Sequence, residues 1–356
     1  MSDGSIRISS RRTPTPVLSE SQRKASSPTK PASEEAPPVQ VDPERASRFI
    51  AEIREIELSD EIKESVRGYE TVGHRNLFLW KWVRRGVEIT TLSSVEESLW
   101  DSGNDTKTLG VVLDVLLDDV ADEGDDPQYL DDLLSITRHS PVSTDHLDAE
   151  KKAYFDYTAL IWKTIWARLA TYPRFEEFRD VLDFDYAQLM NAMRYAFLLR
   201  KHPSIMNMPE HDTYQPHNMH MVINGTIDLM VSPDFDIAEL GDLRRVLLLA
   251  QYMGRIGNLV TTWEREIREK DYSSGVFSLA LSRGIVTLED LIEGDQQNIS
   301  QKIRASDVEE TFLRRWSSFR ERILRLGKRL KTVDVSQIVD GLDTLIQLHL
   351  GSRGLK

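Results

Sequence analysis

From residue 42 onward, apolar residues recur at intervals of three and four, the period of a helix that buries one face. No stretch has the turn-bounded alternation that predicts a strand, and no internal repeat is present. The pattern predicts helices at residues 44–58, 77–87, 106–123, 129–137, 148–170, 175–201, 218–230, 237–268, 277–283, 287–293, 306–326 and 335–350. We therefore expect an all-α fold.

The first 43 residues differ in composition from the rest of the chain. They hold seven of the 14 prolines and many serines and threonines. Such a segment cannot bury enough apolar surface to offset the entropy lost on ordering. It has no apolar core of a secretory signal, and its acidic residues disfavour a transit peptide. We expect residues 1–43 to be a disordered tail and residues 44–356 to form one helical domain.

Composition and charge narrow the class of protein. The hydrophobic fraction of 40% is ample for a core, whereas the net charge of -13 argues against a nucleic-acid partner. The absence of cysteine excludes disulfides and thiolate chemistry. No apolar run approaches the roughly 18 to 20 residues needed to span a membrane. These properties predict a cytoplasmic protein.

Three aspartates interrupt the predicted helix at residues 106–123. Asp114, Asp118 and Asp122 are spaced four residues apart, so they lie above one another on one face. Their neighbours are valine and leucine, which indicates a buried helix. Unpaired carboxylates there cost on the order of several kcal/mol each unless cations neutralise them. The alternative is a solvated acidic face, which accounts better for the acidic residues in 123–126.

A second polar stripe lies about 140 residues later, also within an apolar segment. Asn258, Thr262 and Glu266 follow one another at steps of four residues, so they share one helix face. Such oxygen ligands suit Mg²⁺, which keeps several waters and shares its other positions with phosphate oxygens. Arg255, one turn earlier on that face, can bind a phosphate through two donors. The stripe alone is weak evidence, but its pairing with the aspartates is strong.

The two stripes together resemble the motifs of the class I terpene synthases, D-D-x-x-D and (N/D)-D-x-x-(S/T)-x-x-x-E. The matching residues are Asp118, Asp119 and Asp122 for the first motif and Asn258, Thr262 and Glu266 for the second. Leu259 stands at a non-ligand position where the family often has aspartate. The resemblance covers residues 77–323. It implies a helical barrel in which the motifs face each other across a cavity and hold three Mg²⁺ ions and a prenyl diphosphate.

A narrower resemblance rests on residues 216–230 and on the R-x-x-N start of the second motif. These are most similar to short bacterial diterpene synthases related to ent-kaurene synthase. The resemblance implies a C20 substrate, either geranylgeranyl diphosphate or a bicyclic labdane-type diphosphate. The chain has no D-x-D-D motif for protonation-initiated cyclisation, so a class II cyclase would have to supply the bicyclic compound. The product is a hydrocarbon or an alcohol, and a homodimer is left open.

The resemblance also supplies candidates for substrate contacts. Pro216 stands where the family breaks a cavity-lining helix, so we expect backbone carbonyls near His217 and Asn218 to face the cavity; an ordinary loop is the alternative. Phe78 and Trp82 are the first choices for aromatic walls that tolerate cations. The candidates for contact with the diphosphate are Arg255, Arg265, Lys270 and Arg315.

Ionisation of the diphosphate needs no nucleophilic side chain, because Mg²⁺ bound at Asp118 and its partners, together with Arg255, neutralises the leaving group. No general base for the terminating step can be named from the sequence. A sesquiterpene synthase acting on farnesyl diphosphate and a chain-elongating prenyltransferase remain alternatives, although the latter carries two aspartate-rich motifs. A non-enzymatic helical scaffold is a further alternative, and it predicts that Asp118 and Glu266 are solvent-facing and independent.

Overall fold

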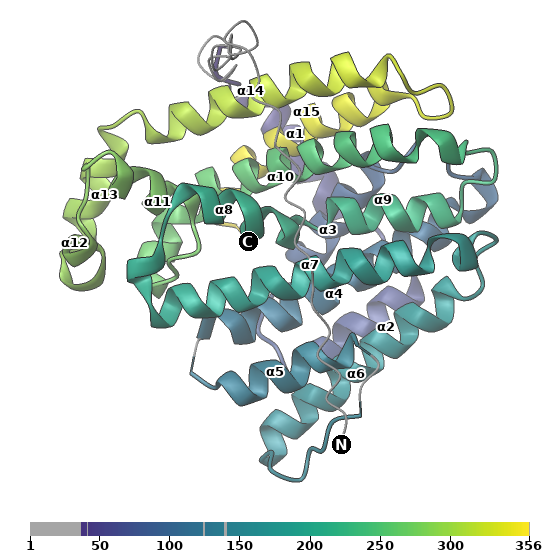
Figure 1. Cartoon of the computed structure of the whole chain (residues 1–356), viewed down its shortest axis with the longest axis horizontal. Coiled ribbons are helices and arrows are strands. Elements are labelled where there is room, and N and C mark those ends of the chain that lie inside the picture. Colours follow the sequence, from purple (N-terminus) through teal and green to yellow (C-terminus); the bar gives the residue numbers. More distant parts are fainter. Residues whose placement is uncertain (1–36, 41, 124, 139–140, 356) are drawn as a thin grey trace, which may run out of the picture.

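Helices make up almost all of the regular structure in this protein (Figure 1). The computed structural model describes residues 37–40, 42–123, 125–138 and 141–355. In these ranges fifteen α-helices are joined by loops and short 3-10 turns, and there is no strand. No helix in the same ranges has a stretch long and apolar enough to cross a membrane. The all-α prediction is confirmed.

The helices agree with the predicted ones in order and, for most, within a few residues at each end. They are α1 (Pro43–Glu55), α2 (Asp60–Tyr69), α3 (Leu77–Ile89), α4 (Trp100–Glu123), α5 (Pro127–Ile136), α6 (Ala149–Leu169), α7 (Phe175–Lys201), α8 (Met208–Tyr214), α9 (Met221–Met230), α10 (Leu240–Glu269), α11 (Gly275–Ser282), α12 (Leu288–Glu293), α13 (Gln296–Arg304), α14 (Val308–Gly327) and α15 (Val335–Gly351). The sequence analysis missed α2, α8 and α13, which are short or strongly polar.

Contacts with the helical domain begin earlier than the predicted boundary at residue 44. Residues 1–36 of the predicted tail lie outside the described residues. Val39 packs against the core, and Asp42 donates its backbone N–H to Gln347 Oε1 of α15 at 2.9 Å. Asp42 also caps α1, because its side chain accepts a hydrogen bond from the backbone N–H of Arg45 at 3.0 Å.

Five helices form a closed ring at the centre of the molecule. Neighbours in this ring pack against each other in the order α3, α4, α9, α10 and α15, and α15 returns to α3. Outside the ring, α7 covers α4 and α9, whereas α14 covers α10 and α15. Figure 1 shows α14 along one side of the molecule and α5 and α6 along the opposite side. The arrangement is a barrel of helices, as the sequence analysis expected.

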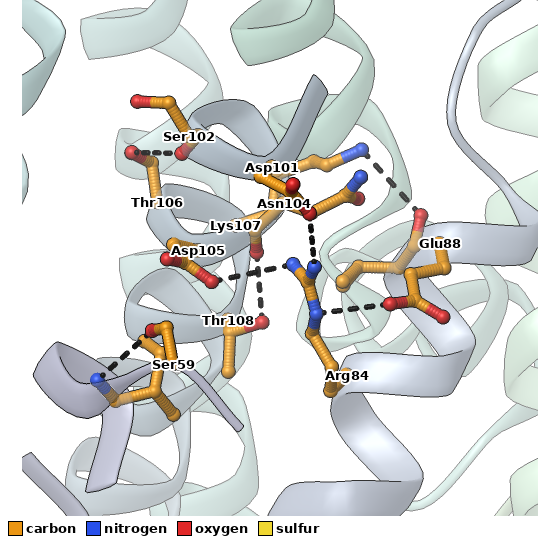
Figure 2. A network of polar contacts seen from close by, with 12 residues as sticks. Ser59, Arg84, Glu88, Asp101, Ser102, Asn104, Asp105, Thr106, Lys107 and Thr108 are labelled. Atoms are coloured by element: carbon orange, nitrogen blue, oxygen red, sulfur yellow. Dashed lines mark hydrogen bonds and ion pairs between the residues drawn. The ribbon is translucent and has the colours of Figure 1, made fainter. Parts of the chain in front are cut away.

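The first half of α4 is buried although its residues are polar. Asn104, Thr106 and Lys107 have no exposed surface. The Lys107 ammonium pairs with Asp228 of α9, with 2.7 Å between Nζ and Oδ1. Figure 2 shows the adjoining network, in which Arg84 of α3 lies beside residues of α4. The helix begins at Trp100 rather than at residue 106. The hydrophobic pattern did not predict this first part, because its buried polar groups are paired with residues distant in sequence.

The chain is broken between α8 and α9, near Pro216. Residues 215–219 form a 3-10 turn that follows α8 directly. His220 then adopts a left-handed conformation with φ of 60°, and α9 starts at the next residue. The predicted helix at residues 218–230 is thus shorter at its start. Helices thus lie on both sides of a 3-10 turn that contains Pro216, and we refer to residues 208–230 as the broken helix.

Candidate active site

The ring of helices encloses a cavity of about 200 Å³. One part of its wall is apolar and the other is acidic. The apolar wall includes Leu79, Trp82, Val83, Val87, Val111, Val115 and Leu345. The acidic wall consists of Asp114, Asp118 and Asp122 from α4, Glu266 from α10 and Asp271 just after it. A cavity with these two walls can hold an anion together with cations at one end and a hydrocarbon at the other.

The first motif contributes two carboxylates to the cavity, Asp118 and Asp122. Burial, followed by the neighbouring carboxylates Asp119 and Asp271, raises the pKa of Asp118 to about 6. Burial and the charge of Asp118 raise the pKa of Asp122 well above its usual value. These shifts are opposite to those that an ion pair produces, so the acidic wall favours a bound cation.

Asp119 is not brought to the cavity. It accepts hydrogen bonds from the guanidinium of Arg75, with 3.1 Å between Nε and Oδ1, and from the Tyr69 hydroxyl at 3.0 Å. Arg75 lies in the connection between α2 and α3, and Tyr69 is the last residue of α2. Successive residues of a helix point in different directions, so Asp119 points away from the cavity that Asp118 lines. Its hydrogen bonds hold the connection between α2 and α3 against α4.

The second motif places Asn258 and Glu266 on the cavity wall and Thr262 behind them. The Thr262 hydroxyl donates to Glu266 Oε1 at 2.5 Å, whereas Glu266 Oε2 is buried and has no hydrogen-bond partner among the residues that the structure describes. Burial raises the pKa of Glu266 to about 7, and the charge of Asp271 adds to that effect. One oxygen of this carboxylate is thus oriented by its own helix, and the other is available for a ligand.

Asp271 is a cavity residue that the sequence analysis missed. Lys270 ends α10 in a left-handed conformation, and the backbone N–H of Asp271 then donates to the Glu266 carbonyl at 3.0 Å. This turn brings the Asp271 carboxylate to the acidic wall, where its charge acts on Asp118, Asp122 and Glu266. Helical spacing could not predict this placement, because the helix ends before Asp271.

The candidate cations divide into two groups. Arg255 and Arg265 line the cavity. Arg255 is 4% exposed and donates to Asn258 Oδ1 at 3.2 Å and to the Ser273 carbonyl at 3.1 Å.

The other two candidate cations do not line the cavity. Lys270 is exposed at the end of α10. Arg315 of α14 pairs with Asp212 of α8 at 2.7 Å, behind the cavity wall. The structure therefore places only the two residues of α10 where a diphosphate could reach them.

The candidates from α3 and the broken helix also divide. Trp82 lines the cavity, but Phe78 does not: it borders a separate hollow together with Leu77 and Lys81. Asn218 lines the cavity and donates to Asp118 Oδ1 at 3.1 Å. His217 is turned toward α10, where its Nδ1 lies 3.1 Å from Gln251 Nε2.

Within the described part of the chain, no group of three or more His, Asp or Glu side chains could hold a metal ion alone. The oxygens of Asp118, Asp122, Asn258 and Glu266 nevertheless suit Mg²⁺. All four residues line the same cavity and offer hard oxygen ligands. Glu266 Oε2 is buried and has no hydrogen-bond partner among the described residues. Magnesium commonly completes its shell with water and substrate phosphate oxygens, so the donors fit an ion shared with a diphosphate.

Comparison with protein-family models found no match, and comparison with curated proteins found none either. Solved structures do match. Abietadiene synthase from Abies grandis has a TM-score of 0.54 at 13% identity, over 86% of this chain and 38% of that one. T. brucei farnesyl diphosphate synthase has a TM-score of 0.52 at 10% identity, over 88% of this chain and 97% of that one.

This chain has the all-α terpenoid synthase fold. It spans 38% of the length of the abietadiene synthase, so the likeness concerns one part of that protein. Because both sequence identities are low, the comparisons establish only the arrangement of helices. The reaction has to be inferred from the residues that line the cavity.

Proposed function

We propose that this protein is a Mg²⁺-dependent class I terpene synthase that ionises a C20 prenyl diphosphate. The observation that carries the proposal is the meeting of the two sequence motifs on one cavity. Asp118 and Asp122 approach from α4, and Asn258 and Glu266 approach from α10. The apolar wall of the same cavity suits the hydrocarbon part of such a substrate.

Asp118, Asp122, Asn258, Thr262 and Glu266 would hold the metal ions, and three ions are proposed from the family resemblance. When bound, Mg²⁺ neutralises the charge that develops on the diphosphate leaving group. The residues of the chain supply the rest of the mechanism, which is binding, orientation and the exclusion of water.

Arg255 is the residue best placed to orient the diphosphate. Its guanidinium is buried on the cavity wall, and no described residue forms a hydrogen bond with its Nε. A planar guanidinium can present two parallel donors to phosphate oxygens. Trp82 and the aliphatic residues of α3 then surround the allylic cation, exclude water and present an aromatic face to positive charge.

The buried carboxylates weigh against a non-enzymatic scaffold. That alternative expects Asp118 and Glu266 to face solvent independently, but Glu266 is 3% exposed and shares its cavity with Asp118. A chain-elongating prenyltransferase has the same fold, so the fold does not distinguish it from a terpene synthase. The residues of the second motif are the feature that does. Here that motif offers an amide, a hydroxyl and one carboxylate instead of a second aspartate-rich run.

A bicyclic labdane-type diphosphate made by a class II cyclase is the proposed substrate. We expect this compound to be turned over with a higher kcat/KM than farnesyl diphosphate. The preference should be moderate, because one methylene in an apolar pocket discriminates by only about 1 to 3 kcal/mol. Some turnover of linear geranylgeranyl diphosphate is therefore also expected.

The deciding experiment incubates the purified protein and Mg²⁺ with C10, C15, linear C20 and bicyclic C20 diphosphates in separate reactions. Diphosphate release is measured together with the organic product, by gas chromatography and mass spectrometry. The highest kcat/KM with farnesyl diphosphate would refute the diterpene assignment. Release that requires isopentenyl diphosphate and gives a longer prenyl diphosphate would indicate a prenyltransferase. No release from any substrate would favour the scaffold.

A further inference from the structure

Three buried polar atoms beside the cavity have no hydrogen-bond partner within the described residues. They are Asp114 Oδ1, Tyr186 Oη and His220 Nε2. The three residues are 7%, 2% and 1% exposed. Most buried polar groups in proteins are paired, so a concentration of unpaired ones indicates a site that handles a ligand or a proton.

These atoms gather around one turn of α4. A Cβ atom at Gly110 would lie 3.4 Å from both Tyr186 Oη and His220 Nε2, so the two atoms flank the same point. Asp114 follows one turn later on the same helix face. Its charge raises the pKa of Tyr186 further than burial alone does. We call these three residues the floor cluster: Asp114, Tyr186 and His220.

The floor cluster adjoins the proposed metal site and contains none of its ligands. After burial, the charges that act on Asp114 are those of Asp118, which raises its pKa, and Arg255, which lowers it. Asp114 and His220 both line the cavity. Their neighbours on its wall include valines of α4 and methionines of the broken helix, so Asp114 is a member of the acidic wall that has apolar neighbours.

His220 is held in an unusual backbone conformation that fixes its ring. Its φ of 60° is sparsely populated by non-glycine residues and tends to occur at functional sites. The ring Nδ1 lies 3.0 Å from Asn224 Oδ1. An amide oxygen can only accept, so Nδ1 carries the proton and Nε2 presents a lone pair to the floor cluster.

We propose that Asp114 is the proton acceptor of the terminating step, with Tyr186 and His220 as positioning residues; this inference rests on the proposed function. In the direct form, a C–H bond beside the cationic carbon breaks. Its electron pair forms the C=C bond, and the proton moves to an Asp114 carboxylate oxygen. Where water attacks the cation first, the C–O bond forms and the proton of that water moves to the same oxygen.

The surroundings of Asp114 suit this role. None of the three unpaired atoms is hydrogen-bonded to another in this structure. A hydroxyl that turns to the ionised carboxylate can donate to it, and an imidazole nitrogen can accept from the protonated form. Burial and the charge of Asp118 raise the pKa of Asp114 well above its usual value. A carbocation in the cavity favours the ionised form of a nearby carboxyl, and the ionised form is the one that can accept a proton.

The test is the product profile of Asp114→Asn, a variant that keeps the shape of the side chain but cannot accept the proton. It is measured with whichever C20 diphosphate the wild type consumes. We expect diphosphate release to fall by no more than tenfold while the main product falls at least tenfold relative to other products. Asp118→Asn should instead reduce diphosphate release at least a hundredfold.

Tyr186→Phe provides a second test, which decides the matter if Asp114→Asn does not fold. We expect it to shift the product ratio in the same direction. Tyr195→Phe is the matched control, because Tyr195 is also a buried tyrosine of α7, but its ring packs against Tyr214, whereas the ring of Tyr186 packs against His220. It should leave the profile unchanged.

An unchanged profile in both Asp114→Asn and Tyr186→Phe would overturn the inference. Loss of diphosphate release as severe as in Asp118→Asn would also overturn it, by assigning Asp114 to the diphosphate site. If the wild type releases no diphosphate from any substrate, the proposed function fails first and takes the inference with it.

Discussion

Replacing Glu266 with glutamine is expected to stabilise the metal-free protein at pH 8 and to have little effect near pH 4. The glutamine keeps the oxygen that accepts from the Thr262 hydroxyl, so the change removes a charge and preserves the hydrogen bond. The prediction follows from the raised pKa of Glu266, which makes its ionisation costly in the folded state.

The sign and size come from the two pKa values of Glu266. Its pKa rises from 4.5 to about 7 on folding, so the folded state binds more protons than the unfolded state between these values. Below pH 4.5 both states are protonated and there is no cost, whereas above pH 7 the full cost applies. At about 1.4 kcal/mol per pKa unit the cost is about 3 kcal/mol.

The assay is urea unfolding with a chelator present, for wild type and Glu266→Gln, from pH 4 to pH 8. For a slope of about 3 kcal/mol per molar, the midpoint of the variant should exceed that of the wild type by about 1 M at pH 8. Mg²⁺ with inorganic diphosphate should stabilise the wild type much more than the variant, because the bound state is linked to folding.

Glu264→Gln is the matched control, two residues earlier on the same helix. Glu264 pairs with Arg304 at 2.8 Å, and that hydrogen bond lowers its pKa, so its replacement should be neutral or slightly destabilising. The reasoning is refuted if Glu266→Gln is no more stable than wild type at pH 8. It is equally refuted if the difference between them does not change between pH 5 and pH 8.

Asp118→Ala and Asn258→Ala should each abolish turnover with little change in helix content or melting temperature, and activity within twofold of wild type would refute their assignment as ligands. Asp119→Asn should instead lower stability by about 1 to 3 kcal/mol through its contact with Arg75 and retain measurable turnover; unchanged unfolding would contradict its fastening role. Deleting residues 1–36 should leave turnover and melting temperature unchanged, and a large loss of activity would show that the tail covers the site.

The sequence predicted the helices best where an apolar stripe runs unbroken. The predicted bounds of α7, at residues 175–201, agree with the structure. The start of α4 was misplaced because residues 104–108 are polar, and their burial depends on partners from other parts of the chain. Helices α2, α8 and α13 were missed because short or polar segments carry too few apolar positions to define a period.

Helical spacing predicted which site residues share a face, but not which way that face turns. Asp118 and Asp122 meet Asn258 and Glu266 on one cavity, as expected from the two stripes. Phe78 borders a separate hollow although it is four residues from Trp82 on α3. Lys270, Arg315 and His217 also lie off the cavity, because their directions depend on a helix end and on partners distant in sequence.

The buried polar half of α4 has a consequence for how the helix is seated. The apolar half repeats valine and leucine, so its packing alone would tolerate a slide along the axis. Lys107 and Asp228 do not tolerate one, because a shift of one turn, about 5.4 Å, would leave two buried charges unpaired at a cost of about 3 to 5 kcal/mol. This pair therefore fixes the axial position of α4, and with it the position of Asp118 in the barrel about three turns later. A substitution there could misalign the ligand without touching it.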